Sequence, residues 1–466
     1  MFLGLYKIEV GLRNDLEWKT KFIRPNNSKL LIMRCLCSPT KENTWYTRRS
    51  TLLSLGTCYV WYLGFSRLAN PASITQQSTL VYKVTLLWIM KRDGVPNAKL
   101  NSFTMSTHHA VVTIAPRAKL DIHQVPTPTP KASEILLRNE WTASTPLDLH
   151  QNDGHLLVTP PQVLGDGLAG TITHIGPSAT NLKVGDKVFG FAYQGNEQKA
   201  HQEYVCVPEN VLGVIPDGFS MPEVVTLPNN FVTVFHALTA NLGLELPWPK
   251  PDGWMPKKKD WTILIWGGSS SVGQFALQIL RWYGYTKRLS TASKRNHTLL
   301  EEYGATSLFD YNDPEAIVQI SEAAGGGGVN LVLDCIGSQS GSLAPVAKIA
   351  GKGATVAILL PVVVHDASET DAPEYSMDVA AAADWKEGVV VKGVRTHFYQ
   401  ENSFFKDKLQ PVIMPSLLEL GVVKPNRQRI VEGETLLERA QKAMDVLRRR
   451  EVSGERLVWR VWEGKG

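Results

Sequence analysis

One segment limits the possible folds of this chain more than any other: DWTILIWGGSSSVGQFALQIL, residues 260–280. Its first part is an uninterrupted apolar run, which favours a buried strand. Its last part places Val272, Ala276 and Ile279 on one face of a helix. A strand that passes through a glycine-rich loop into a helix is typical of α/β folds that bind the phosphates of a nucleotide. We therefore expect an α/β fold with a phosphate-binding loop at this point.

The loop matches the G-x-G-x-x-G pattern incompletely. Gly268 and Gly273 hold the first and third glycine places, and Ser270 holds the second. Serine hydroxyls add donors at a helix N-terminus, where the helix dipole already favours an anion. The alternative is that Gly and Ser only permit a tight turn. The residues predicted to bind a pyrophosphate are Gly268, Ser269, Ser270, Ser271, Val272 and Gly273.

A short basic segment follows the next predicted strand. A NAD-selective site has an acidic residue about 20 residues after the loop. This chain instead has Ser293, Lys294, Arg295 and Asn296 in that region. Lys and Arg make charge-assisted hydrogen bonds to phosphate oxygens, so this segment suits a 2′-phosphate. The preferred cofactor is therefore NADP(H), and the alternative is a solvated basic turn.

The chain from Met105 onward divides by pattern. Residues 105–231 contain short β-rich runs with turn residues between them, which predicts a compact β-rich domain. Strand and helix patterns alternate over residues 232–423, which predicts a parallel sheet with helices on both faces. Residues 424–466 contain a helical pattern and a closing strand, and we expect them to return to the β-rich domain.

Residues 1–104 differ from the rest in charge. They hold 15 Lys and Arg against 5 Asp and Glu, in a chain whose net charge is +5. The positive charges are scattered among acidic residues, which does not suit a nucleic-acid arm or a targeting peptide. The apolar run Leu52–Phe65 is shorter than the ~20 residues that cross a bilayer. We expect a poorly ordered extension, a mature protein that starts at Met105, and no nucleic-acid or membrane partner.

Cysteine is scarce beyond this extension. The chain has 5 Cys, and only Cys206 and Cys335 lie after residue 104. No disulfide framework or four-Cys zinc lobe can form from two residues, which indicates a reducing compartment such as the cytoplasm. Both are expected to be small buried hydrophobic residues.

A series of motifs follows in one order between Met105 and Gly466. They are TPLD (145–148), PPQVLGDGLAGTITHIGPSATNLKVGDKVFGF (160–191), AHQEYVCVP, the Ser-rich loop, SKRN, YGATSLFDYNDP (303–314), LVLDCIG and VSGERLVWRV. In this order the chain resembles the medium-chain dehydrogenase/reductase superfamily, and within it the zinc-independent fungal enoyl reductases and quinone-reductase-like proteins. Zinc-dependent members have a Cys near the TPLD position and a His-Glu pair where this chain has Leu164, Gly165 and Asp166. The resemblance therefore implies no metal ligand set.

The resemblance also implies a fold and a cofactor site. The fold is a Rossmann-type doubly wound parallel sheet with a GroES-like β-rich catalytic domain. Tyr311 lies near the adenosine, although it could also be a packing residue at a strand end. The residues that the resemblance places around the nicotinamide are Pro146, Leu147, Asp148, Leu149, Ile358 and Leu359.

Two residues are candidates for catalysis by the same resemblance. Thr233 approaches the nicotinamide from the interdomain edge, and the alternative is an ordinary helix-start hydroxyl. His150 stands where relatives often have Lys, and its ordinary pKa range suits proton transfer. The alternative for His150 is a surface histidine. No general acid stands out from the sequence.

The activity that the resemblance implies is NADPH-dependent reduction of an α,β-unsaturated (thio)ester in secondary metabolism. Two alternatives remain: an NADPH-dependent quinone or enal reductase, and a non-catalytic NADPH-binding protein. The expected partners are a small-molecule or carrier-bound acyl substrate and a polyketide synthase, and the expected state is a monomer or homodimer. Likeness of fold gives no substrate identity.

Overall fold

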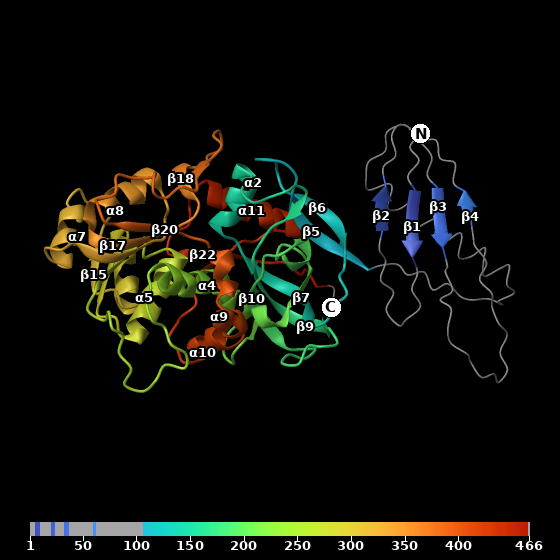
Figure 1. Cartoon of the computed structure of the whole chain (residues 1–466), viewed down its shortest axis with the longest axis horizontal. Helices are drawn as coiled ribbons and strands as arrows, with labels where there is room; N and C mark the ends of the chain where they lie inside the picture. The colour runs from blue at the N-terminus through green and yellow to red at the C-terminus, as the bar shows by residue number, and fades with distance from the viewer. Residues whose placement is uncertain (1–4, 10–19, 24–31, 37–58, 62–105, 465–466) are drawn as a thin grey trace. The chain divides into compact units, whose positions relative to one another are not determined.

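The computed structural model describes residues 5–9, 20–23, 32–36, 59–61 and 106–464 (Figure 1). The chain forms two units, Met1–Phe103 and Thr104–Gly466. The expectations for residues 1–104, for the apolar run and for a start at Met105 fall largely outside the described residues and stay predictions. None of the helices in the described ranges has both the length and the apolar character needed to cross a membrane.

The first unit contains one four-stranded sheet in the order β2-β1-β3-β4. Its strands are β1 (Leu5–Glu9), β2 (Thr20–Ile23), β3 (Ile32–Leu36) and β4 (Tyr59–Trp61). β1 pairs antiparallel with β2 and parallel with β3, and β4 pairs antiparallel with β3.

The second unit contains a six-stranded parallel sheet in the order β15-β14-β13-β16-β17-β20. Its strands are β13 (Thr262–Trp266), β14 (Lys287–Thr291), β15 (Ser307–Phe309), β16 (Val329–Asp334), β17 (Ala350–Leu359) and β20 (Val390–Val394). The connecting helices include α5 (Ser271–Tyr283), α6 (His297–Glu302), α7 (Ala316–Ala324) and α8 (Ala344–Ile349). This strand order is that of doubly wound dinucleotide-binding sheets, and it reverses between β13 and β16. The prediction of a Rossmann-type parallel sheet is confirmed.

The local sequence explains the central strand and helix of this sheet. β13 is buried along its whole length, as the apolar run TILIW predicts for a strand covered on both faces. Ser270 caps the N-terminus of α5. Gly284 ends this helix with a φ of +86°, a conformation that glycine adopts without strain.

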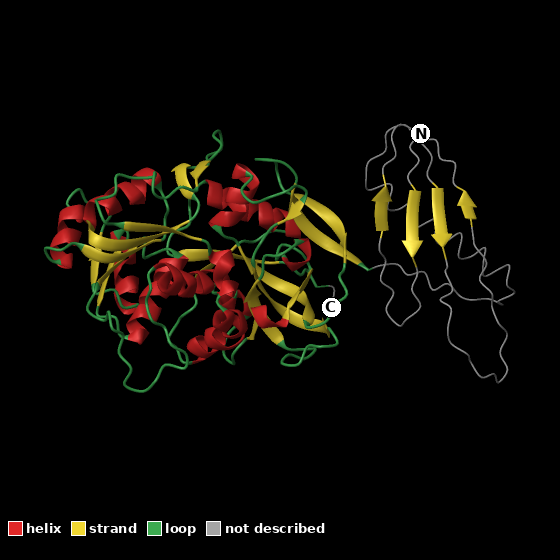
Figure 2. Ribbon diagram, viewed as in Figure 1, coloured by secondary structure: helices red, strands yellow, loops and turns green. Residues whose placement is uncertain are grey.

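The β-rich half of the second unit contains a seven-stranded sheet, which Figure 2 shows beside the helix-covered parallel sheet. Its strands are β7 (Glu134–Ala143), β9 (Gly167–Ile175), β10 (Lys187–Phe191), β11 (Tyr204–Pro208), β12 (Leu212–Val214), β21 (Arg427–Ile430) and β22 (Glu455–Arg460). A three-stranded sheet adjoins it, formed by β5 (Thr107–Thr113), β6 (Asp121–Pro126) and β8 (Gln162–Val163). The prediction of a β-rich domain beside the parallel sheet is confirmed.

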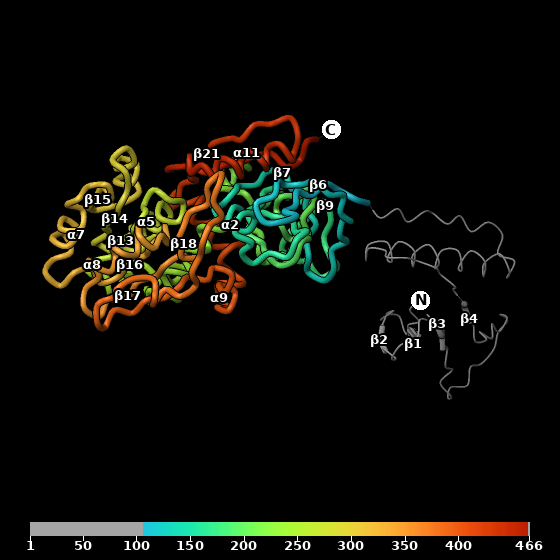
Figure 3. Tube along the Cα trace, turned by 90° about the horizontal axis from the view of Figure 1, so that it is seen from above, coloured from blue at the N-terminus to red at the C-terminus, as the bar shows by residue number. Residues whose placement is uncertain are grey.

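The C-terminal segment completes the large sheet of the β-rich half. β22 lies between β7 and β21, antiparallel to the first and parallel to the second. Helix α11 (Leu436–Arg448) contacts α2 (Pro146–Gly154). Arg448 binds the Asp153 carboxylate with two hydrogen bonds of 2.7 and 2.8 Å. Figure 3 shows this segment, in red, beside β7.

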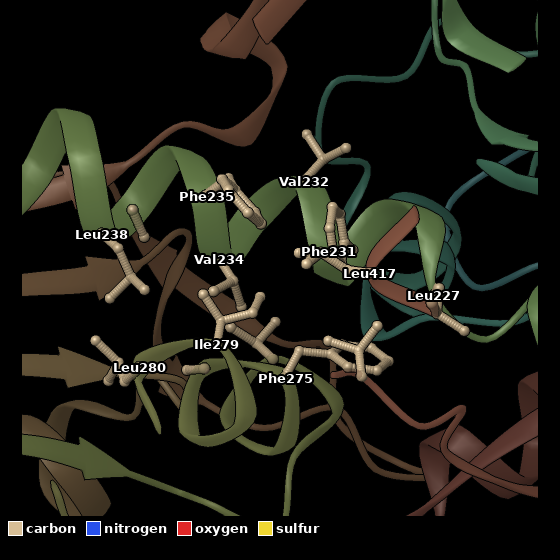
Figure 4. Packing of buried hydrophobic residues seen from close by; sticks show 14 of the residues in the cluster. Leu227, Phe231, Val232, Val234, Phe235, Leu238, Phe275, Ile279, Leu280 and Leu417 are labelled. Atoms are coloured by element: carbon tan, nitrogen blue, oxygen red, sulfur yellow. The ribbon is translucent and has the colours of Figure 1, made fainter. Parts of the chain in front are cut away.

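Helix α4 (Pro228–His236) packs on α5 and joins the two halves. Figure 4 shows Phe231, Val234 and Phe235 of α4 near Phe275 and Ile279 of α5. All of these side chains belong to one buried apolar cluster. Since α5 begins at the glycine-rich loop, this packing fixes α4 in relation to the loop. Further short elements are α3 (Met221–Val224), α9 (Ser403–Lys408), α10 (Met414–Glu419), β18 (Val362–His365) and β19 (Glu374–Ser376).

Candidate active site

The loop between β13 and α5 is built from glycines that have no room for a side chain. Gly267 has a φ of +82°. A Cβ on Gly268 would lie 2.0 Å from Ser290 Oγ, and one on Gly273 would lie 2.6 Å from the carbonyl oxygen of Gly267. The loop therefore presents bare backbone at a helix N-terminus, which is how α/β folds bind a pyrophosphate.

The three serines of this loop take part in different hydrogen bonds. Ser270 Oγ accepts a hydrogen bond of 3.0 Å from the N–H of Gly273, so it caps the helix, and its hydroxyl also hydrogen-bonds to the Cys335 side chain. Ser271 Oγ donates to the side chain of Asn426. The carbonyl oxygen of Ser269 accepts from Gln274. Ser270 is thus the serine that caps the helix in the place of the missing middle glycine.

The residues predicted for the 2′-phosphate and the adenosine lie at the carboxyl ends of β14 and β15, the two strands on one side of β13. Ser293 follows β14, Tyr311 follows β15, and their hydroxyl oxygens are 2.9 Å apart. Lys294 and Arg295 are exposed. Asn296 instead points toward the C-terminal segment, where its amide donates to Ser453 at 3.3 Å.

An acidic residue lies close to this basic turn, at the end of β15. Asp310 accepts hydrogen bonds from the backbone of Asn312 and of Lys294, which lower the pKa of its carboxyl. The segment directly after β14 has no carboxylate. The four residues 293–296 and Asp310 therefore give this corner of the site a mixed charge, with the two exposed cations outermost.

The loop after β16 meets the glycine-rich loop at the point where the strand order reverses. Asp334 is fully buried and accepts from the N–H groups of Ile336 and Gly337 and from the Ser342 hydroxyl. Burial raises the pKa of Asp334 to about 6. Asp334 was not among the residues predicted for the site, although an aspartate at the end of an apolar strand is a recognisable signal.

Ile358 and Leu359 end β17, with Ile358 buried and Leu359 partly exposed. Their position at the carboxyl edge of the sheet suits the predicted contact with a nicotinamide.

The predicted TPLD contacts lie at the start of α2 in the β-rich half. Pro146 is exposed and Leu147 is partly exposed, whereas Asp148 and Leu149 are buried. Asp148 accepts hydrogen bonds from the N–H groups of Thr145 and Gly165, at 2.8 and 3.2 Å. Burial raises its pKa to about 7, and the nearby Asp166 adds to the rise. The Asp148 carboxylate therefore ties α2 to the strand that follows Gly165.

His150 has a specific partner. Its Nδ1 lies 2.7 Å from the hydroxyl of Tyr375 on β19, and the two rings meet edge to face. Burial lowers the pKa of His150 to about 4, although Asp366 and Asp153 oppose this shift. The imidazole is therefore neutral at pH 7 and is held by the segment that follows β18. Its role in catalysis stays a prediction.

Thr233 lies in the middle of α4 and bridges to the parallel-sheet half. Its hydroxyl donates to the carbonyl oxygen of Asn229 at 2.8 Å and lies 2.9 Å from Thr396 Oγ1. The residue is 4% exposed. Thr396 begins a short 3-10 helix that follows β20. Thr233 therefore links α4 to the segment after β20, and its approach to a nicotinamide stays a prediction.

A buried group of charged residues in the β-rich half was not predicted. Lys199 Nζ lies 2.8 Å from Asp166 Oδ1, and both side chains are almost fully buried. His201 Nε2 lies 4.0 Å from Asp148 Oδ2. Burial lowers the pKa of His201 to about 3, so this ring is neutral. Lys199 and His201 lie in the loop before β11, and no periodic pattern of residues there indicates that they are buried.

A surface hollow of about 500 Å³ lies elsewhere, against residues 245–254 and the start of α9. It is lined by Glu245, Leu246, Pro247, Trp248, Trp254, Asn402, Phe404 and Phe405. None of the predicted site residues lines it. In the described parts of the chain, no three or more His, Cys, Asp or Glu side chains form a group that could hold a metal ion.

The parallel sheet, its bare-glycine loop and the β-rich half joined to it define a dinucleotide-dependent oxidoreductase of two domains. The family described as "Alcohol dehydrogenase GroES-like domain" matches residues 131–237, and the family described as "Zinc-binding dehydrogenase" matches residues 271–369.

Three fungal proteins illustrate the relationship. A trans-enoyl reductase, tazE, from Aspergillus terreus is 32% identical over 234 residues, which cover 48% of this chain and 75% of that protein. A trans-enoyl reductase, phm4, from Pyrenochaetopsis sp is 28% identical over 72% of this chain and 91% of its own. The enoyl reductase component of lovastatin nonaketide synthase, lovC, from Aspergillus terreus is 26% identical over 79% of this chain and 98% of its own.

Solved structures agree in fold. The CurK enoyl reductase matches with a TM-score of 0.58 at 16% identity, over 75% of this chain and 99% of its own. The quinone oxidoreductase from Coxiella burnetii matches with a TM-score of 0.57 at 20% identity, over 77% of this chain and 100% of its own.

The chain belongs to the medium-chain dehydrogenase/reductase superfamily, and its relatives include fungal trans-enoyl reductases and dehydrogenases. It is an oxidoreductase of a dehydrogenase family that binds a nicotinamide cofactor. The resemblance inferred from the ordered motifs is thereby confirmed.

Proposed function

We propose that the chain is an NADPH-dependent enoyl reductase that reduces an α,β-unsaturated thioester without zinc. The observation that carries the proposal is the combination of the bare-glycine loop with the basic turn after β14. Relatives named as trans-enoyl reductases support the choice of reaction. Likeness to quinone oxidoreductases supports the fold alone.

The proposed cofactor contacts follow the carboxyl edge of the parallel sheet. Gly268 to Gly273 hold the pyrophosphate, and the Ser270 hydroxyl lies at the same helix N-terminus. Lys294 and Arg295 bind the 2′-phosphate by charge-assisted hydrogen bonds. Tyr311, which contacts Ser293, lies beside the adenosine. When bound, the nicotinamide supplies the hydride.

The β-rich half supplies the opposite wall of the proposed site. The first turn of α2, Pro146 to Leu149, lines the nicotinamide end, and Asp148 fixes this turn through two backbone hydrogen bonds. Thr233 holds the interdomain edge through its contact with Thr396. His150, neutral and bonded to Tyr375, borders the mouth of the site. These residues position the substrate, which is a large part of what a protein contributes to hydride transfer.

Zinc independence is supported by the types of residue at the expected ligand positions. Thr145, Pro146 and Leu147 occupy one of these positions and Leu164, Gly165 and Asp166 the other. Threonine, proline, leucine and glycine are not the Cys, His or carboxylate ligands that zinc prefers. Asp166, the one carboxylate, is engaged by Lys199.

The proposed substrate is carried on coenzyme A or on an acyl carrier, with a polyketide synthase as the partner. One relative is named as the enoyl reductase component of a polyketide synthase, which supports this proposal. The chain is proposed to act in the cytoplasm, since the two cysteines after residue 104 are unpaired, which suits a reducing compartment.

The test measures cofactor oxidation by the full chain. NADPH and, separately, NADH are supplied with a short enoyl thioester and with a simple quinone. We expect oxidation of NADPH, not of NADH, that depends on the thioester. Turnover of quinone alone would replace the proposed substrate class, and tight NADPH binding without turnover would make the chain a cofactor-binding protein. Equal use of NADH would remove the 2′-phosphate contacts from Lys294 and Arg295.

A further inference from the structure

The buried ion pair between Asp166 and Lys199 takes no part in the cofactor contacts described above. Asp166 directly precedes β9, and Lys199 lies in the loop that leads to β11. Their side chains are 1% and 6% exposed. Removing two charges from water costs several kcal/mol per ion, and a buried pair seldom repays this in stability. Stability alone therefore does not explain why two charges are kept at this depth.

The ammonium group of Lys199 is only partly satisfied. An ammonium has three N–H donors. One donates to Asp166, and within the described residues the other two have no acceptor. A buried donor without an acceptor costs about 1–3 kcal/mol. The geometry thus leaves two donors for an oxygen that the protein does not itself supply.

A chain of contacts leads from this pair to Thr233. Asn229 Nδ2 lies 3.4 Å from Asp166 Oδ2, and the carbonyl oxygen of Asn229 accepts the Thr233 hydroxyl at 2.8 Å. Asp166 therefore contacts α4 one helical turn before Thr233, the residue proposed to link the two halves of the site.

His397, which follows Thr396, is within electrostatic reach of the pair from the other half of the unit. Burial lowers the pKa of His397, while Asp166 raises it and Lys199 lowers it. Both halves of the unit thus face the ion pair.

The neighbouring groups do not offer an equivalent cation. His201 is neutral because burial lowers its pKa to about 3. Arg456 is cationic and its buried Nε also lacks a hydrogen-bond partner, but the charge it faces is that of Asp148, the carboxylate that fixes α2. Lys199 is therefore the cation of this group that combines free donors with a position near Thr233.

We propose that Lys199, held in place by Asp166, is a catalytic residue whose ammonium donates a hydrogen bond to the thioester carbonyl oxygen of the substrate. This inference rests on the proposed function. Hydride addition at the β-carbon breaks the π bond of the alkene, and its electron pair moves to give an enolate with the charge on that oxygen. The ammonium stabilises the oxyanion and keeps its proton. A proton from water then adds to the α-carbon and completes the reduction.

The test compares Lys199→Met with Lys183→Met, which removes an exposed lysine of the same half. Removal of one donor to an oxyanion typically lowers turnover by roughly 100-fold to 1,000-fold. We expect that loss for Lys199→Met with an enoyl thioester, a dissociation constant for NADPH within about twofold of wild type, and no change for Lys183→Met. Wild-type turnover in Lys199→Met would overturn the inference and leave the proposed function standing.

A second measurement needs no turnover. Acetoacetyl coenzyme A ionises to an enolate that absorbs in the near ultraviolet, and a fixed cation at the carbonyl oxygen increases the enolate fraction. We expect wild type and Lys183→Met to increase this fraction on binding and Lys199→Met not to do so. An equal enolate fraction in the three proteins would overturn the inference even if the wild type proved inactive with enoyl thioesters, a result that bears on the proposed function alone.

Lys199→Met leaves a buried carboxylate without its partner, so its fold needs a control. The double variant Asp166→Asn, Lys199→Met keeps a pair of similar volume without charge. We expect it to have the circular dichroism and NADPH affinity of wild type but the low turnover of Lys199→Met. Recovery of turnover in the double variant would show that the single variant failed by misfolding, and would overturn the inference.

Discussion

Substitution of Gly268 by alanine tests the architecture of the glycine-rich loop directly. The added Cβ would lie 2.0 Å from Ser290 Oγ, whereas ordinary contacts begin near 3.4 Å. Ser290 is fully buried, and its hydroxyl donates to the carbonyl oxygen of Ile265 in β13 at 2.9 Å. Escape from the clash would move this hydroxyl by more than an ångström and break that bond, which is worth about 1 kcal/mol. Overpacking adds about 1–3 kcal/mol.

We therefore expect Gly268→Ala to lower the free energy of unfolding by about 2 kcal/mol or, if the loop shifts instead, to weaken NADPH binding by up to about 30-fold. Urea denaturation and fluorescence titration with NADPH measure the two effects. Adding Ser290→Ala removes the clashing oxygen, and the double variant should recover at least about 1 kcal/mol relative to the sum of the two single changes. If Gly268→Ala behaves as wild type in both assays, Ser290 of β14 does not lie as close to the loop as the structure places it.

Three further outcomes are expected. Ser270→Asp keeps a good helix cap but puts a negative charge beside the phosphates, so it should weaken NADPH binding at least about tenfold. Ser270→Asn, which caps without a charge, should not weaken it. If titration gives the two variants equal affinities for NADPH, Ser270 does not lie in the phosphate site. The folded-state pKa of His150 is about 4, against 6.5 in the unfolded chain. Its contribution to stability is therefore complete above pH 6.5 and is lost as the pH falls to 4. Between these pH values the free energy of unfolding should rise less steeply with pH for His150→Gln than for wild type, and an unchanged slope would contradict the burial of the imidazole. Arg448→Met leaves the Asp153 carboxylate buried without its bidentate partner, so it should lower the free energy of unfolding by about 3 kcal/mol. Arg450→Met removes an exposed ion pair and should change this free energy by less than about 1 kcal/mol.

The parallel sheet was predictable because its signals are local. The buried run at β13, the glycine-rich loop and the helical spacing of α5 all lie within 21 residues, 260–280. Each signal depends on chain geometry that any strand–loop–helix unit must satisfy. The place of Ser293 and Tyr311 at neighbouring strand ends follows from the same alternation of strand and helix, since the carboxyl ends of parallel strands share one edge.

The side-chain partners within the site were not predictable in the same way. Tyr375, which binds His150, lies 225 residues further along the chain. Asn426 accepts from Ser271 across 155 residues. Lys199 and Asp166 are 33 residues apart, with no periodic pattern to link them. Such contacts are created by tertiary packing, so neither the composition nor the spacing of residues predicts them.

The place of β22 in the sheet has a consequence for how the protein is made. This strand ends at Arg460, a few residues from the end of the chain, yet it lies between β7 and β21. Its buried Trp459 donates to Ser144, just before the turn that carries Pro146 to Leu149. During synthesis the parallel sheet leaves the ribosome complete, while the β-rich half waits for its final strand. The nascent chain thus completes the sheet that carries the glycine-rich loop before the sheet that supports Pro146 to Leu149, and a truncation that removes β22 would leave the first intact and the second incomplete.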